Sequence, residues 1–433
     1  MRSGSAEKVA RFLGFSSDGR ESLAALRNLS HREWSRVLQW LDDSGLAFYF
    51  LQKLKDVGAT DSLPTEILSQ LERDFASNHL RVKNLWQRFA ELNKQFDKLN
   101  VRYCVVKGFS LVPDFCPSAG LRYQADLDYL IEDASLPAAR RVLFDAGYVS
   151  KPSASSNEHI FVSPASPAIQ TSRHSDKYLP VGSHAIELHT NMWDSRLHGV
   201  LLSVDLFSLK TSIVRHGNDL TFPGLAEEDA FLLQVIHACH HLFTLWIRTS
   251  CFFEIAYFLN RRSGDNDFWN RVEQRIGQSA VLREFVVIVS ELAAQLFAAP
   301  LPLLVQAWSV DLRAGVRVWI DHYARPWAFC ELPVYEFTLF PRSKLALFLR
   351  KQYEVTSDIA KFQQGTRRLP ASRLVRMAAS IRNDPSLAFN RAWWKRQLLI
   401  QRGAFHVLSR VRYLSEIPRW WWLNRARART ASL

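Results

Sequence analysis

The sequence predicts an α+β fold, in which a small strand-rich block lies between two helical regions. Apolar residues recur at spacings of three and four before residue 101 and again beyond residue 225, which is the period of a helix. Short β-branched and aromatic runs occupy the stretch between them, as is typical of strands. This order of helices, strands and helices indicates a core of about 120 residues flanked by helical layers.

Residues 1–100 are predicted to form a helical N-terminal region. Trp34 and Val37 follow the helical spacing, and Ser30 stands where an N-cap is expected. The last helix of the region is predicted from about Pro64 to Leu99.

Residues 101–224 are predicted to form the strand-bearing core. The run VRYCVV at 101–106 predicts a strand, which is followed by a turn at Lys107-Gly108 and a helix-like segment. The run ADLDYLIED predicts the second strand, and a helix follows it and ends at Gly147. Three more strands are predicted, at His159–Val162, Ala168–Ser172 and Ser183–His189.

A helical domain is predicted at 225–340 and a basic, Trp/Arg-rich region at 341–433. The formal net charge is +13. Residues 342–433 hold 20 Lys and Arg against 4 Asp and Glu, a local balance of +16, so the rest of the chain carries −3. Anionic partners are therefore expected to bind the tail.

The composition excludes several classes of protein. With 433 residues, 48% apolar and 22% charged, the chain is neither disordered nor collagenous. Its 5 cysteines include no CxxC pair, which argues against a disulfide framework or a zinc ribbon. No secretory signal is recognised at the N-terminus, and polar residues and prolines interrupt the apolar stretch Leu292–Val310. A cytoplasmic protein is expected.

Two aspartates mark the candidate site. Asp126 and Asp128 are two residues apart on a predicted strand, so their carboxylates share one face and need a cation. Hard divalent ions such as Mg²⁺ prefer carboxylate oxygens, and Glu187 on a later strand is the expected third carboxylate. Upstream, Gly108 and Ser110 are placed to let backbone N–H groups approach a phosphate. The parts together predict metal-assisted phosphoryl or nucleotidyl transfer.

The motifs K-G-x-x-L (residues 107–111), R-x-x-x-D-x-D-x-L (122–130) and E-L-H (187–189) resemble the polymerase-beta-like nucleotidyltransferase superfamily. They are most similar to a poorly characterised bacterial nucleotidyltransferase family within it, and nucleotidyltransferase toxins that are paired with antitoxins share part of the pattern. The resemblance implies a mixed sheet with helices and an NTP substrate. The usual Gly-Ser or Gly-Gly turn of the superfamily is interrupted here by Phe109.

The resemblance also implies roles for individual residues. Asp126 and Asp128 would bind two Mg²⁺ ions, with Mn²⁺ as an alternative, and Glu187 would be the third metal-binding carboxylate. Lys107 and Arg122 would face the triphosphate, next to Gly108 and Ser110.

Three histidines could add to the site or serve the fold. His189 shares a strand face with Glu187, so it is expected either to orient the metal ligands or to be a partly buried histidine with a backbone partner. His237 and His241 have a spacing that can bind zinc. Because no glutamate lies between them and no third ligand is evident, a structural or substrate-contacting role is favoured.

The tail interleaves tryptophans with arginines. This composition suits packing on the preceding domain, an anionic membrane surface, or RNA, whose phosphates and bases arginine and tryptophan contact. The tryptophans in question are Trp393, Trp394, Trp420, Trp421 and Trp422.

Three functions are consistent with these features. The leading hypothesis is a metal-dependent nucleotidyltransferase that moves a nucleoside monophosphate from an NTP to an unidentified acceptor. The alternative is a catalytically weak module of the same fold that docks through its tail, either at the inner face of a membrane or on nucleic acid. A third hypothesis is a toxin-like enzyme that modifies tRNA, with phosphate contacts supplied by the tail.

Overall fold

The computed structural model describes residues 4–325, apart from short gaps at 17–18, 154, 218–219 and 245–247 and longer ones within 164–183 and 195–212. Beyond residue 325 it describes only 329, 418, 422–423 and 425–426. The predicted strand Ala168–Ser172 and nearly all of the basic tail therefore lie outside the described residues.

The chain divides into two compact units. The first comprises residues 1–194, 202–239 and 248–310, and the second comprises 195–201, 240–247 and 311–433. The second unit contains α13 (Ala314–Trp319) and a short π-helix (Ile320–Ala324). The four-part domain division stays a prediction.

The N-terminal region is helical, as predicted. Ser30 caps α3 with a reciprocal capping box, since its hydroxyl accepts from the Glu33 N–H and the Glu33 carboxylate accepts from the Ser30 N–H. The helices are α1 (Gly4–Leu13), α2 (Gly19–Arg27), α3 (His31–Ser44), α4 (Ala47–Asp56) and α5 (Thr65–Lys98), with a 3₁₀ turn at Thr60–Ser62.

A seven-stranded mixed sheet follows, which confirms the predicted α+β class. Its order is β3-β4-β5-β2-β1-β7-β6, with β2 parallel to β5 and β1 parallel to β7. Sequence periodicity did not identify β3, β6 or β7, which are only three to five residues long. The strands are β1 (Tyr103–Val106), β2 (Asp126–Ile131), β3 (Val149–Lys151), β4 (Glu158–Val162), β5 (Ala185–His189), β6 (Ile213–Gly217) and β7 (Leu220–Gly224).

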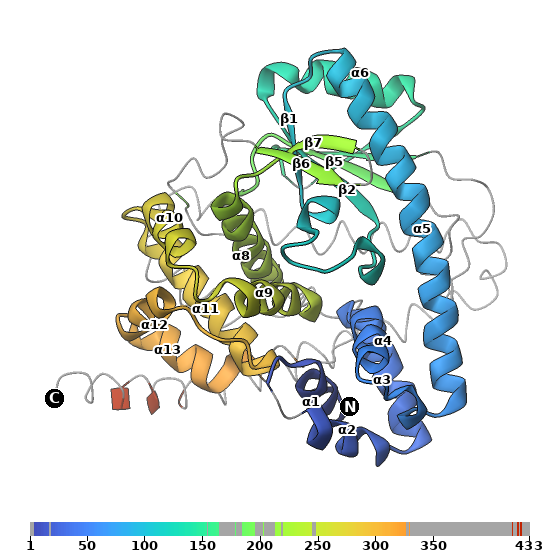
Figure 1. Ribbon diagram of the computed structural model, residues 1–433. Helices are drawn as coiled ribbons and strands as arrows, with labels where there is room; N and C mark the ends of the chain where they lie inside the picture. Colours follow the sequence, from blue (N-terminus) through green and yellow to red (C-terminus); the bar gives the residue numbers. More distant parts are fainter. Residues whose placement is uncertain are drawn as a thin grey trace, which may run out of the picture. The chain divides into compact units, whose positions relative to one another are not determined.

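The two faces of the sheet differ in character. Leu127 and Tyr129 of β2 and Ile186 and Leu188 of β5 are buried in one core with apolar side chains of α5 and of α6 (Leu136–Asp145), and α5 runs along the sheet in Figure 1. Because side chains alternate along a strand, the intervening carboxylates are presented on the opposite face. The apolar core thereby fixes the orientation of the site residues.

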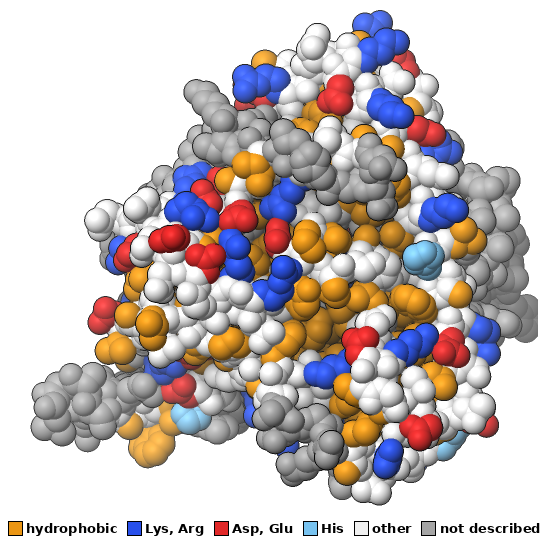
Figure 2. Space-filling view, viewed as in Figure 1, with side chains coloured by type: hydrophobic (Ala, Val, Ile, Leu, Met, Phe, Trp, Pro, Cys, Tyr) orange, Lys and Arg blue, Asp and Glu red, His pale blue; other side chains and the backbone are white. Residues whose placement is uncertain are grey.

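Helices return after the sheet. Figure 2 shows acidic and basic side chains side by side over α8 and α10, where Arg262 and Arg271 pair with Glu227 and Arg275 pairs with Asp229. None of the described helices is long and apolar enough to span a bilayer. These helices are α8 (Glu227–Thr244), α9 (Thr249–Arg262), α10 (Asn266–Ile276), α11 (Ala280–Phe297) and α12 (Leu303–Val310).

The segment after β1 corrects one prediction. A helix was expected after Lys107-Gly108, but the chain forms only a 3₁₀ turn at Gly108–Leu111. Val112 is extended because Pro113 follows it, and a residue before proline is disfavoured in the helical region. No α-helix N-terminus is therefore present at Gly108 to hold a phosphate.

Candidate active site

Lys107 links β1 to the turn in an unusual backbone conformation. Its φ of 60° and ψ of −165° lie in a region that is nearly restricted to glycine and costs on the order of 1–3 kcal/mol for another residue. Ser110 offsets part of this strain, since its N–H and its hydroxyl both donate to the Lys107 carbonyl, at 3.0 and 2.8 Å. Ser110 therefore positions Lys107, while its predicted contact with phosphate stays a prediction.

The predicted carboxylates lie together on β2 and β5. Asp128 is directly opposite Glu187 in the parallel register, and Asp126 is two residues earlier on the same face. The Asp128 Oδ1 atom accepts from Lys107 Nζ at 2.7 Å. One ligand atom from each of Asp128, Glu187 and His189 lies within 4.8 Å of the others. Sequence periodicity had placed these side chains on one face, and the structure brings them together.

His189 bridges the two strands. Its Nε2 atom is 3.1 Å from Asp128 Oδ1 and 3.6 Å from Glu187 Oε2. Burial alone lowers the pKa of His189, but the two carboxylates raise it to about 9. His189 is therefore protonated between the two carboxylates at neutral pH. Of the two roles that the sequence left open, this position favours orientation of the metal ligands over a purely structural histidine with a backbone partner.

The charges of the cluster shift its pKa values in different directions. Burial acts to raise the pKa of Asp128, but Lys107 and His189 hold it well below its usual value. Burial, and then repulsion by Asp128, raises the pKa of Asp126. Burial raises the pKa of Glu187 to about 7, with Asp128 adding to the effect. Crowded, partly desolvated carboxylates of this kind fit a hard divalent cation.

Gln124 was not singled out from the sequence, and it packs against the turn. It is buried, and its side-chain amide donates to the Asp126 carbonyl at 3.0 Å. A Cβ on Gly108 would lie 2.4 Å from Gln124 Nε2. Gly108 therefore permits a close approach between the turn and the segment that leads into β2. Gln124 is not one of the defined positions in the sequence motifs, so the motifs did not identify it.

A Gly108→Ala substitution tests this packing. Gly108 has a φ of +52°, so alanine would add both backbone strain and a clash with Gln124. We expect a loss of about 2–4 kcal/mol in the free energy of unfolding, measured by chemical denaturation. Gly58→Ala is the matched control, because Gly58 has a φ of +63° with no atom within 4 Å of an added Cβ. Equal losses in the two variants would contradict the close packing.

Comparison with known proteins places this site in a family. A family model described as "uncharacterised nucleotidyltransferase" matches residues 30–298, which include both strands of the carboxylate cluster. The chain belongs to this nucleotidyltransferase family. No curated protein matches the chain. The family shown here is the one that the K-G, D-x-D and E-L-H motifs indicated.

Arg122 lies in a different setting from the one that the family resemblance implied. Its Nε and Nη2 atoms donate to the Glu254 carboxylate of α9 at 2.6 and 3.3 Å, and Tyr49 donates to the same carboxylate at 3.1 Å. Burial alone lowers the pKa of Arg122, but Glu254 raises it above its usual value. The guanidinium of Arg122 is thus engaged by a buried carboxylate. The predicted contact of Arg122 with the triphosphate stays a prediction.

Phe109, which interrupts the turn in this member of the family, packs against the long helix. The ring is buried, and its centroid is 4.9 Å from that of Trp86 and 5.1 Å from that of Phe89, both on α5. Phe109 thus anchors the turn to the long helix by aromatic packing.

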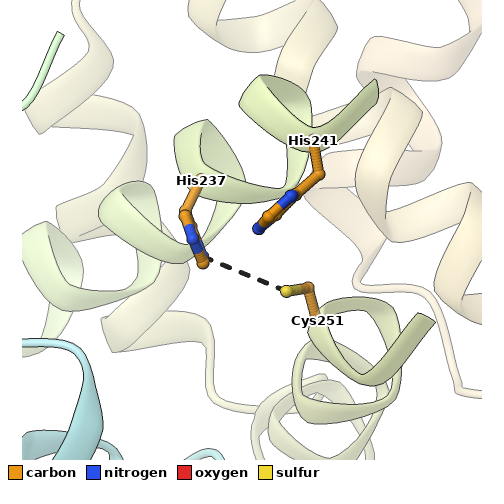
Figure 3. Close-up of side chains that lie close together, drawn as sticks. All are labelled: His237, His241 and Cys251. Atoms are coloured by element: carbon orange, nitrogen blue, oxygen red, sulfur yellow. Dashed lines mark hydrogen bonds between the residues drawn. The ribbon is translucent and has the colours of Figure 1, made fainter. Parts of the chain in front are cut away.

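His237 of α8 lies near Cys251 of α9 (Figure 3). His237 and His241 are one helical turn apart, and the Cys251 Sγ atom is 4.0 Å from His237 Nδ1. Burial raises the pKa of Cys251 to about 12, so the thiol stays protonated at neutral pH. Cys251 is nevertheless a third potential metal ligand, which the sequence did not indicate, because a bound metal ion displaces a thiol proton. The structural or substrate-contacting role of the histidines stays a prediction.

Proposed function

We propose that this protein is a metal-dependent nucleotidyltransferase that moves a nucleoside monophosphate from an NTP to a hydroxyl or phosphate acceptor. The observation that carries the proposal is the meeting of Asp126, Asp128 and Glu187 on one face of two parallel strands. Membership of a nucleotidyltransferase family supports the same reaction. The alternative module that docks through its tail would not require three crowded carboxylates.

The residues of the site have separable tasks. Asp126, Asp128 and Glu187 would hold Mg²⁺ or Mn²⁺, which supplies charge neutralisation for the triphosphate and lowers the pKa of an acceptor hydroxyl. Lys107 and His189 hold the Asp128 carboxylate in place at 2.7 and 3.1 Å. Glu187, or the metal-bound alkoxide itself, would handle the proton of the acceptor.

Isothermal titration of each NTP, with and without Mg²⁺, tests the proposal. We expect binding of at least one NTP that requires the ion and is lost in the variant Asp126→Asn/Asp128→Asn, because neutral amides do not compensate a divalent charge. Pyrophosphate release in the presence of a cell lysate as acceptor source would then report transfer. Failure of the folded wild-type protein to bind any NTP would overturn the proposal, as would binding that is indifferent to the ion.

The affinity for metal is expected to rise with pH. Below pH 7 Glu187 is protonated, and up to about pH 9 His189 carries a proton between the carboxylates. An ion that binds the same oxygens must displace these protons. Titration with Mn²⁺ should therefore show affinity increasing from pH 6 to pH 9, by up to about tenfold per pH unit for each proton released. In His189→Gln only the step near pH 7 should remain, and a flat profile in the wild-type protein would contradict this account.

A further inference from the structure

Arg248 is a cation near the carboxylate site, and it forms no ion pair with any carboxylate that the structure describes. It directly precedes α9, and its Nη2 atom donates to the Tyr123 carbonyl at 2.8 Å. Among the residues that the structure describes, no carboxylate lies within ion-pair distance of this guanidinium. Tyr123 is three residues before Asp126, the first residue of β2.

The surroundings of Arg248 hold it in place. Its guanidinium carbon is 5.9 Å from the centre of the Tyr123 ring, and that of Arg81 is 5.2 Å from the same ring. A Cβ on Gly45, the αL residue that ends α3, would lie 3.2 Å from Arg248 Nε. Two guanidinium groups therefore contact the segment that leads into β2, and the side chain of Arg248 is packed on a glycine and an aromatic ring.

Two other cations near the carboxylates already have anionic partners. Lys107 binds Asp128, and Arg122 is paired with Glu254, whose side chain is 3% exposed. An NTP brings several negative charges to the site. Its α-phosphate must lie at the carboxylate cluster, because that phosphorus reacts. The β- and γ-phosphates leave as pyrophosphate, and a protein cation beside them would add to the charge neutralisation that the metal ions supply.

We propose that Arg248 binds the β- and γ-phosphates of the NTP, in the place that the sequence suggested for Arg122. A guanidinium presents a planar fork of N–H donors that suits phosphate oxygens. The hydrogen bond to the Tyr123 carbonyl holds this fork beside the segment that leads into β2, and no described carboxylate pairs with it. This inference rests on the proposed nucleotidyl transfer, and it names the residue that would distinguish a triphosphate from a monophosphate.

The test compares the NTP that binds most tightly with its own monophosphate, by titration in Mg²⁺. Arg248→Gln should weaken NTP binding about tenfold or more and leave monophosphate binding within about threefold of the wild-type value. Arg248→Lys should lie between, because an ammonium keeps the charge but not the fork. Arg261→Gln is the matched control, since Arg261 lies on α9, the helix that Arg248 precedes, and has the same kinds of contact, with the Pro113 carbonyl and the Tyr257 ring.

Each outcome separates this inference from the proposed function. Unchanged NTP binding in Arg248→Gln, with normal Mg²⁺-dependent binding in the wild-type protein, would overturn the role of Arg248 alone. Equal weakening of NTP and monophosphate would also overturn it, because the effect would not depend on the β- and γ-phosphates. If Arg248→Gln melts at a lower temperature than the wild-type protein, the test is made on Arg248→Lys instead. A ratio of NTP affinity to monophosphate affinity that is unchanged from wild type in that variant would overturn the role of Arg248. Absence of NTP binding in the wild-type protein would overturn both proposals.

Discussion

Replacing Glu187 by glutamine is expected to slow nucleotidyl transfer by about 10²–10⁴-fold while NTP binding changes little. General base catalysis contributes a factor of this size, and Glu187, directly opposite Asp128 on the neighbouring strand, is the carboxylate that we propose for the proton transfer. Asp126, Asp128 and Lys107 stay in place to hold the nucleotide. Glutamine keeps the shape of the side chain and can still accept from His189.

Single-turnover transfer of label from an NTP labelled on its α-phosphate, with lysate as acceptor source, measures the rate. Titration of the unlabelled NTP measures binding in the same preparation. Glu132→Gln is the matched control, because Glu132 follows β2 at the end away from the site and forms an exposed ion pair with Arg102. A parallel loss of rate and of affinity in Glu187→Gln would mean that Glu187 serves nucleotide binding rather than chemistry.

The sequence allowed the carboxylate cluster to be predicted because strand periodicity is local. Asp126, Asp128 and Glu187 alternate with apolar residues, so burial of one face decides where the carboxylates point. The same argument placed His189 beside Glu187. The core that enforces this orientation, between α5 and the sheet, also follows from a regular apolar pattern on a long helix.

The partners of the basic residues could not be predicted in this way. Arg122 and Glu254 are 132 residues apart, and no local period indicates that α9 brings them together. From the sequence, Phe109 only interrupts the expected glycine turn. Its packing against Trp86 of α5 is evident only from the structure. Such pairings depend on the packing of one element on another, which a single sequence does not specify.

The ion pair between Arg122 and Glu254 gives the largest stability effect that we expect. Glu254→Gln should lower the free energy of unfolding by about 3–5 kcal/mol, because it leaves a buried guanidinium without an opposite charge. Tyr49 still finds an acceptor in the glutamine oxygen, so the loss reports the charge and not the hydrogen bond. Chemical denaturation of the wild-type protein and the variant measures the difference.

Two further variants make this prediction specific to burial. Glu227→Gln removes one carboxylate from an ion pair on α8 whose glutamate side chain is 39% exposed, and it should cost at most about 1 kcal/mol. The triple variant Tyr49→Phe/Arg122→Met/Glu254→Met should recover most of the stability lost in Glu254→Gln. Apolar side chains can replace a buried ion pair with little loss, and phenylalanine leaves no hydroxyl without the acceptor that Tyr49 has in Glu254. If Glu254→Gln lowered the free energy of unfolding no more than Glu227→Gln does, the Arg122 guanidinium would have to bind water or another anion once Glu254 is neutralised. Its engagement by Glu254 would then not exclude Arg122 from binding phosphate.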